Sequence, residues 1–181
     1  MKERLKVALD VDDVLAAFTP HAHTHYGKEL IKLNYWCSDT MEEHFGKDWF
    51  VPISQREEFW KTLPVLSDAK LIDFEFDYYI SSFPIEMYDA RIEWLMVNGF
   101  PNKELIVSSD KLKTCIELGV NVLIDDKPST IESLNGSGVL GIHFINEYAG
   151  FMPVGDYIIT NLDQVKGILE EYEEIADNRT C

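Results

Sequence analysis

Cysteines and long apolar runs are both scarce in this chain of 181 residues. Cys37, Cys115 and Cys181 show neither Cys-x-x-Cys nor the spacing of zinc ligands, so we expect reduced, structural thiols. No stretch approaches the run of about 20 apolar residues that a membrane span requires. The apolar run after Lys6 is broken by Asp10, which argues against the core of a signal peptide. These absences favour a cytoplasmic protein.

Positive charge is also in short supply. Lys and Arg together number 16 against 32 Asp and Glu, and the formal net charge is −16. Such a surface repels phosphate backbones and acidic lipids, so we expect neither a nucleic-acid duplex nor a membrane among the partners. A site that handles phosphate in this chain therefore needs local positive charge, from a metal ion or from individually placed lysines.

Strand and helix patterns alternate along most of the chain. Strands are predicted at residues 6–9, 78–80, 104–107, 120–124, 139–145 and 157–159, with helices between many of them. The helix predicted over residues 84–98 places Ile85, Tyr88, Ile92 and Leu95 on one face and stops at Gly99. Alternation over residues 78–176 predicts an α/β fold with a doubly wound, Rossmann-like parallel sheet.

Residues 19–66 interrupt this alternation with helix-like patches and no clear strand pattern. We predict a small helical cap at residues 19–66, inserted after the first strand, and a core domain made of residues 1–18 and 67–181. The aromatic side chains of the cap are expected to form mainly its own core. His21, His23 and His25 could suggest a metal site, but alternate residues of a helix do not share a face, so only His21 and His25 could pair. We therefore expect solvated surface for all three.

Acidic side chains crowd the end of the first strand, at Asp10, Asp12 and Asp13. Two carboxylates about 4 Å apart repel by roughly 4 kcal/mol at an effective dielectric of about 20, so the cluster needs a cation, a shared proton or wide contact with solvent. Ligands of parallel sheets gather at the carboxyl ends of the strands, where Asp125 and Asp126 are also expected. An all-oxygen pocket of this kind suits Mg²⁺.

Hydroxyl and lysine side chains follow the neighbouring strands. Ser81 and Ser82 come after the second strand and Lys111 after the third, and they are candidates for holding phosphate oxygens. Lys113 is the alternative to Lys111. The competing interpretation for either residue is an exposed lysine, since a single lysine on a helix usually faces solvent. We favour Lys111 because it is nearer the strand end.

The simplest chemistry for these parts is the attack of a carboxylate on phosphorus, which forms an acyl phosphate that water then hydrolyses. Asp10 is the candidate nucleophile, and Asp12 is the candidate acid and base for the leaving oxygen and the water. Crowding by the other carboxylates is expected to raise the pKa of Asp12.

The order of these residues resembles the four motifs of haloacid-dehalogenase-like phosphatases: Asp10-x-Asp12-x-Val14, then Ser81, then Lys111, then Ile124-Asp125-Asp126. Within that superfamily the chain is similar to the 5'(3')-deoxyribonucleotidase group over about residues 7–128, on Asp-Val-Asp-Asp-Val-Leu-Ala and on residues 109–111 and 123–128. Ser109 and Lys127 stand where that group often has arginine. The resemblance implies a Mg²⁺-dependent phosphatase that acts on (deoxy)ribonucleoside monophosphates.

The resemblance also implies a role for each matching residue. Asp10 would be nucleophile and metal ligand, Asp12 would be the acid and base and would offer its main-chain oxygen to the metal, Asp125 would be a metal ligand, and Asp126 would act on the metal through a water or from its outer sphere. The phosphate-binding residues would be Ser81, Ser82 and Lys111, and the residues lining the base pocket would be Phe18, Tyr35 and Trp36.

Other functions stay open at this point. The same chemistry suits a phosphatase of a sugar phosphate or an amino-acid phosphate. A non-enzymatic phospho-receiver would have its lysine last, whereas Lys111 precedes Asp125. A silent binding protein fits less well, because all four motif positions keep competent residues. The sequence leaves open base selectivity, 5' or 3' preference, and a monomer or homodimer.

Overall fold

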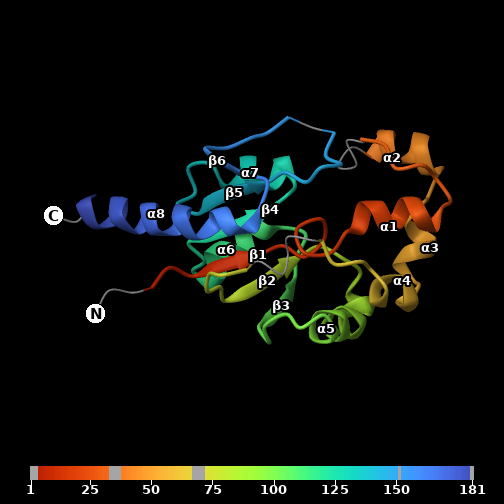
Figure 1. Ribbon diagram of the computed structural model, residues 1–181, viewed down its shortest axis with the longest axis horizontal. Coiled ribbons are helices and arrows are strands. Elements are labelled where there is room, and N and C mark those ends of the chain that lie inside the picture. The colour runs from red at the N-terminus through yellow and green to blue at the C-terminus, as the bar shows by residue number, and fades with distance from the viewer. Residues whose placement is uncertain (1–3, 33–37, 67–71, 151, 180–181) are drawn as a thin grey trace.

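A six-stranded parallel sheet forms the centre of the computed structural model, which describes residues 4–32, 38–66, 72–150 and 152–179 (Figure 1). The strand order is β3-β2-β1-β4-β5-β6, and each neighbouring pair is parallel. The strands are β1 (Val7–Leu9), β2 (Tyr78–Ser81), β3 (Glu104–Val107), β4 (Val122–Asp125), β5 (Leu140–Phe144) and β6 (Tyr157–Ile159). The predicted doubly wound α/β fold is confirmed.

Helices cover both faces of the sheet because successive strand residues point to opposite sides. One buried cluster joins alternate strand residues to α5 (Tyr88–Val97) and α8 (Val165–Arg179), and includes Leu9, Tyr79, Ile124, Trp94 and Val165. The residues between them face α6 (Lys111–Leu118) and α7 (Pro128–Leu134), in a cluster that includes Ala8, Ile80, Leu123, Cys115 and Leu134. The sheet is therefore the middle of three layers.

Local sequence signals set several helix boundaries. The Asp110 carboxylate accepts a hydrogen bond from the Lys113 amide and caps α6, which ends at the left-handed Gly119. Pro128 occupies the first turn of α7, where its missing N–H costs nothing. Asn161 forms a capping box with Gln164 over the short helix η3 (Leu162–Gln164), which leads into α8.

The helix predicted over residues 84–98 forms as a short helix followed by α5, and of its predicted apolar face Leu95 is buried while Tyr88 and Ile92 pack against the core. Ile85 is 61% exposed in the short helix η2 (Ile85–Met87), and Tyr88 and Ile92 of α5 are half-buried. The buried residues of α5 also include Arg91 and Trp94. A pattern of apolar residues could not identify Arg91 as buried, since its side chain is charged.

Strand and helix do not alternate throughout residues 78–176 as predicted. Between β5 and β6 the described residues, 145–150 and 152–156, contain no helix. Pro153 and the left-handed Gly155 oppose helix formation in this link.

Helices α1 (Phe18–His25), α2 (Ser38–Phe45), α3 (Phe50–Ser54) and α4 (Glu57–Lys61) lie between β1 and β2 in the chain. Figure 1 shows them beyond one end of the sheet, with the end of α8 at the other. Phe59 and Trp60 share the buried cluster of the sheet, so these cap aromatics do not form a separate core. The division into a core and a cap stays a prediction. None of the described helices is long and apolar enough to cross a membrane.

His23 is not on solvated surface as predicted. Its side chain is buried, and Nδ1 lies 2.8 Å from the Thr19 carbonyl oxygen. His21 and His25 are half-buried on α1 and pack against Phe59.

We expect Gly155→Ala to lower the free energy of unfolding by about 2 kcal/mol, since a side chain at positive φ is strained by roughly 1–2 kcal/mol. Gly155 has a φ of +83°, and an added Cβ would lie 2.9 Å from Cγ2 of Ile131. Gly167→Ala in α8 is the matched control, because its Cβ would meet nothing within 4 Å. Removing that helical glycine should raise stability by about 0.5–1 kcal/mol. Urea unfolding of both variants measures whether each substitution lowers or raises the free energy of unfolding.

Candidate active site

The candidate site lies where β1 and β4 pair at the centre of the sheet. The chain leaves β1 toward β2 on one side, while β4 leads to β5 on the other. Ligands of doubly wound sheets bind outside the carboxyl ends of the strands at such a reversal of strand order. The Asp10 amide donates to the Ile124 carbonyl at 2.9 Å, which extends the pairing by one residue and holds Asp10 next to Asp125.

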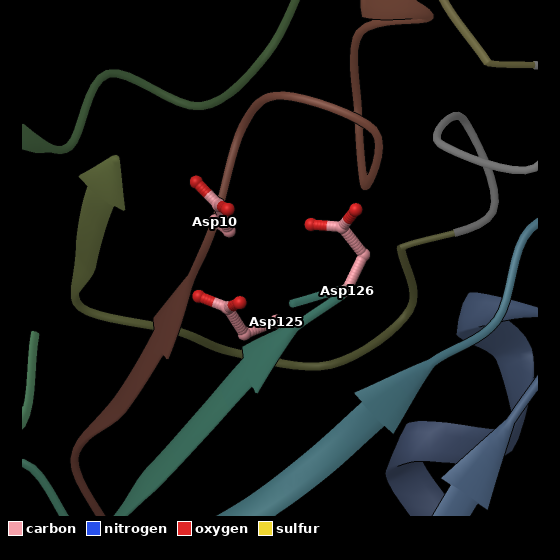
Figure 2. Close-up of side chains that lie close together, drawn as sticks. All are labelled: Asp10, Asp125 and Asp126. Carbon is pink, nitrogen blue, oxygen red and sulfur yellow. The ribbon is translucent and has the colours of Figure 1, made fainter. Parts of the chain in front are cut away.

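Three carboxylates converge at this point. Oxygens of Asp10, Asp125 and Asp126 all lie within 4.8 Å of one another, and all three side chains are buried. Figure 2 shows them around one space beyond the ends of β1 and β4. Burial, together with repulsion from Asp13, Asp125 and Asp10, raises the pKa of Asp126 well above its usual value. The donor atoms of this cluster fit a hard divalent cation.

Lys111 is the cation that the structure places in the cluster. Its Nζ lies 2.6 Å from Oδ2 of Asp10 and 2.6 Å from Oδ2 of Asp125. Burial alone would lower the pKa of Lys111, but attraction to these carboxylates raises it above its usual value. Lys113 is 69% exposed and faces Glu117 on the same helix. Of the two predicted candidates, Lys111 is therefore the one at the site.

The side chain of Asp12 does not belong to the cluster of Asp10, Asp125 and Asp126. Its Oδ1 accepts a hydrogen bond from Nη2 of Arg91 at 2.8 Å, and Arg91 is fully buried. The pKa of Asp12 is raised to about 6, mainly by burial and further by repulsion from Asp10, while Arg91 opposes the shift. The predicted direction is thus confirmed, but burial rather than crowding is the main cause.

Arg91 is the functional candidate that the sequence reasoning missed. Its guanidinium carbon lies 5.5, 5.7 and 5.1 Å from the ring centroids of Trp60, Phe83 and Trp94. The available signal was a single arginine next to the apolar positions of a predicted helix. That signal is weak, since arginines on helices usually face solvent.

Asp13 holds the turn that follows the strand. It has a φ of 57°, and its carboxylate accepts hydrogen bonds from the Thr19 amide at 2.9 Å, the Thr19 hydroxyl at 2.7 Å and the Tyr148 hydroxyl at 2.8 Å. Asn146 donates to its carbonyl oxygen at 3.1 Å. Tyr148 and Asn146 were not predicted, because they are more than a hundred residues away in the chain.

Two neighbouring cavities open over these residues. The smaller, of about 80 Å³, is lined by the predicted catalytic and phosphate-binding residues together with three others: Asp10, Asp12, Ser81, Ser82, Lys111, Ser109, Lys127 and Thr130. The larger, of about 230 Å³, is mainly aromatic and is lined by Asp12, Phe18, Met41, Trp49, Phe50, Trp60 and Ser82. Asp12 and Ser82 belong to both. Phe18, one of the three residues predicted to line a base pocket, lines the larger cavity, whereas Tyr35 and Trp36 lie outside the described residues.

Known proteins resemble the chain in fold more than in sequence. No protein-family model matches it. Solved structures of a haloacid dehalogenase-like family hydrolase from Xanthomonas campestris and of a HAD-superfamily hydrolase from Geobacter sulfurreducens match with TM-scores of 0.58 and 0.55, at 12% and 11% identity. The first match covers 98% of this chain and 100% of the other, and the second 92% and 96%. The chain has the haloacid-dehalogenase-like fold.

A curated relative carries a more specific name. A Bacillus cereus protein named "Putative nucleotidase" is 26% identical over 162 residues, which are 75% of this chain and 83% of that protein. The fold component of the predicted resemblance is therefore confirmed, and the likeness to deoxyribonucleotidases stays a prediction.

We expect MgCl₂ to raise the melting temperature of the protein and a chelator to reverse the shift, because an ion that binds only the folded state stabilises it. Asp125→Asn should lose most of the shift by removing one ligand. Asp110→Asn is the matched control, since asparagine caps a helix as well as aspartate does. Thermal unfolding with and without the ion measures this. An undiminished shift in Asp125→Asn would place the ion elsewhere.

Proposed function

We propose that this chain is a Mg²⁺-dependent phosphomonoesterase that hydrolyses (deoxy)ribonucleoside monophosphates through an aspartyl-phosphate intermediate. One observation carries the proposal: a small cavity lined by Asp10, Asp12 and Lys111 adjoins an aromatic cavity and shares the Asp12 wall with it. The partner we expect is thus a small phosphorylated molecule.

Asp10 is the nucleophile of this proposal. A carboxylate oxygen of Asp10 bonds to phosphorus while the bond from phosphorus to the leaving oxygen breaks, and the leaving oxygen takes a proton from Asp12. Water then attacks phosphorus and gives a proton to Asp12, which releases phosphate and restores Asp10. A pKa of about 6 suits Asp12 to both transfers near neutral pH.

Positive charge and hydroxyl groups would hold the phosphate. Lys111 already lies between Asp10 and Asp125, and Ser81 and Ser82 line the same cavity. Mg²⁺ held by carboxylates of Asp10, Asp125 and Asp126 and by the main-chain oxygen of Asp12 would supply further charge against the phosphate oxygens. The net charge of −16 makes this local positive charge necessary.

The aromatic cavity supports a nucleotide as the substrate. Phe18, Trp49, Phe50 and Trp60 offer ring faces on which a base can stack, and Asp12 and Ser82 connect this cavity to the phosphate cavity. One molecule could thus place its phosphate and its base in the two cavities at once. The name of the Bacillus cereus relative points in the same direction.

We expect Asp10→Asn to lower turnover of nucleoside monophosphates by about 1,000-fold or more, because an amide cannot attack phosphorus. Asp156→Asn makes the same chemical change at an exposed residue before β6, at the opposite end of the strands from the site, and should keep full activity. Release of inorganic phosphate measures both variants. Unchanged activity in Asp10→Asn would exclude the aspartyl-phosphate mechanism.

We expect Phe50→Ala to raise KM for nucleoside monophosphates about tenfold or more, because stacking on one aromatic ring contributes roughly 1–3 kcal/mol per base. The KM for a small phosphomonoester without a base should not change. Ile116→Ala is the control, since Ile116 is an exposed apolar side chain on α6. A panel of nucleotide, sugar and amino-acid phosphates should be assayed alongside. Hydrolysis of sugar phosphates with inert nucleotides would favour the alternative substrate class.

A further inference from the structure

We propose that Arg91 positions Asp12, so that Oδ2 of Asp12 is the atom that donates the proton to the leaving oxygen. This inference rests on the proposed function and adds to it a residue from a helix that carries none of the predicted motifs.

The contact between the two residues is close and dry. Nη2 of Arg91 lies 2.8 Å from Oδ1 of Asp12, and the side chains are 0% and 9% exposed. The two residues are 79 positions apart, so the contact depends on the packing of α5 against the sheet. A buried charge without a partner is costly, which means that each side chain holds the other in place.

Aromatic rings restrict the guanidinium on several sides. Trp60, Phe83 and Trp94 lie around it at ring-centroid distances of 5.1 to 5.7 Å, a range in which cations and ring faces attract. Two of these rings are themselves fixed by hydrogen bonds. Trp60 donates to the Ile53 carbonyl at 2.9 Å, and Trp94 donates to the Leu63 carbonyl at 2.6 Å. Arg91 thus presents Nη2 to Asp12 from a rigid support.

The direction of this hydrogen bond determines where the proton of Asp12 resides. A guanidinium can only donate, so Oδ1 must accept, and the neutral acid carries its hydrogen on Oδ2. Asp12 lines both cavities, and the leaving oxygen of a nucleotide joins the group in one cavity to the group in the other. An acid with its hydrogen on Oδ2 at this boundary is placed to protonate that oxygen.

Two substrates, one with a poor and one with a good leaving group, distinguish positioning of the acid by Arg91 from a purely structural role. A nucleoside alkoxide needs a proton in order to leave, whereas p-nitrophenolate leaves without one. The ratio kcat/KM covers the steps up to release of the leaving group, so it omits the later hydrolysis of the intermediate. A loss of proton donation therefore lowers kcat/KM for the nucleotide far more than for p-nitrophenyl phosphate.

The experiment compares Arg91→Gln and Arg91→Lys with the unsubstituted protein on both substrates. Arg91→Gln should lower kcat/KM for a nucleoside monophosphate about 100-fold and for p-nitrophenyl phosphate less than about fivefold. Arg91→Lys keeps the charge but not the planar guanidinium. It should lower kcat/KM for the nucleoside monophosphate about tenfold and again affect p-nitrophenyl phosphate much less. Thermal unfolding checks the fold, and Arg91→Lys carries the comparison if the glutamine variant does not fold.

A double-mutant cycle with Asp12→Asn completes the test. If Arg91 acts through Asp12, substituting Arg91 in the Asp12→Asn background should lower kcat/KM by less than about a further twofold. Equal losses for both substrates, or a full further loss in that background, would overturn the positioning role and leave the proposed function standing. An unsubstituted protein inactive on every phosphomonoester would overturn the proposed function itself, and this inference with it.

Discussion

Burial of negative charge at the ends of β1 and β4 is the constraint on which the rest of the site depends. The side chains of Asp10, Asp12, Asp13, Asp125 and Asp126 are all buried in a chain with a net charge of −16. Burial disfavours the charged form of each carboxyl, so each needs a partner. Lys111 bridges Asp10 and Asp125, Arg91 holds Asp12, and Thr19 and Tyr148 donate to Asp13.

The doubly wound sheet makes this arrangement possible. Arg91 comes from α5, which packs on one face of the sheet, and Lys111 comes from α6, which packs on the other. Two cations thus approach one row of acids from opposite sides without competing for space. A helix pair on a single face would bring the two positive charges much closer together.

The order of the acidic and hydroxyl residues made much of this site predictable. Asp10 directly follows β1 and Asp125 ends β4, so the two must come together once these strands pair, and the caps Asp110 and Asn161 mark helix starts through local chemistry. Arg91 escaped prediction because its partner lies 79 residues away and its helix position is normally solvated. The aromatic cavity was predictable only in part, since whether Trp49 and Phe50 face a core or a ligand depends on long-range packing.

The turn at Asp13 connects Asp12 to the aromatic cavity. Tyr148 donates to Asp13, the residue after Asp12, and also packs against Met41, which lines that cavity. One tyrosine thus joins the turn next to Asp12 to the wall of the aromatic cavity, so the two cavities share a support as well as the lining residues Asp12 and Ser82.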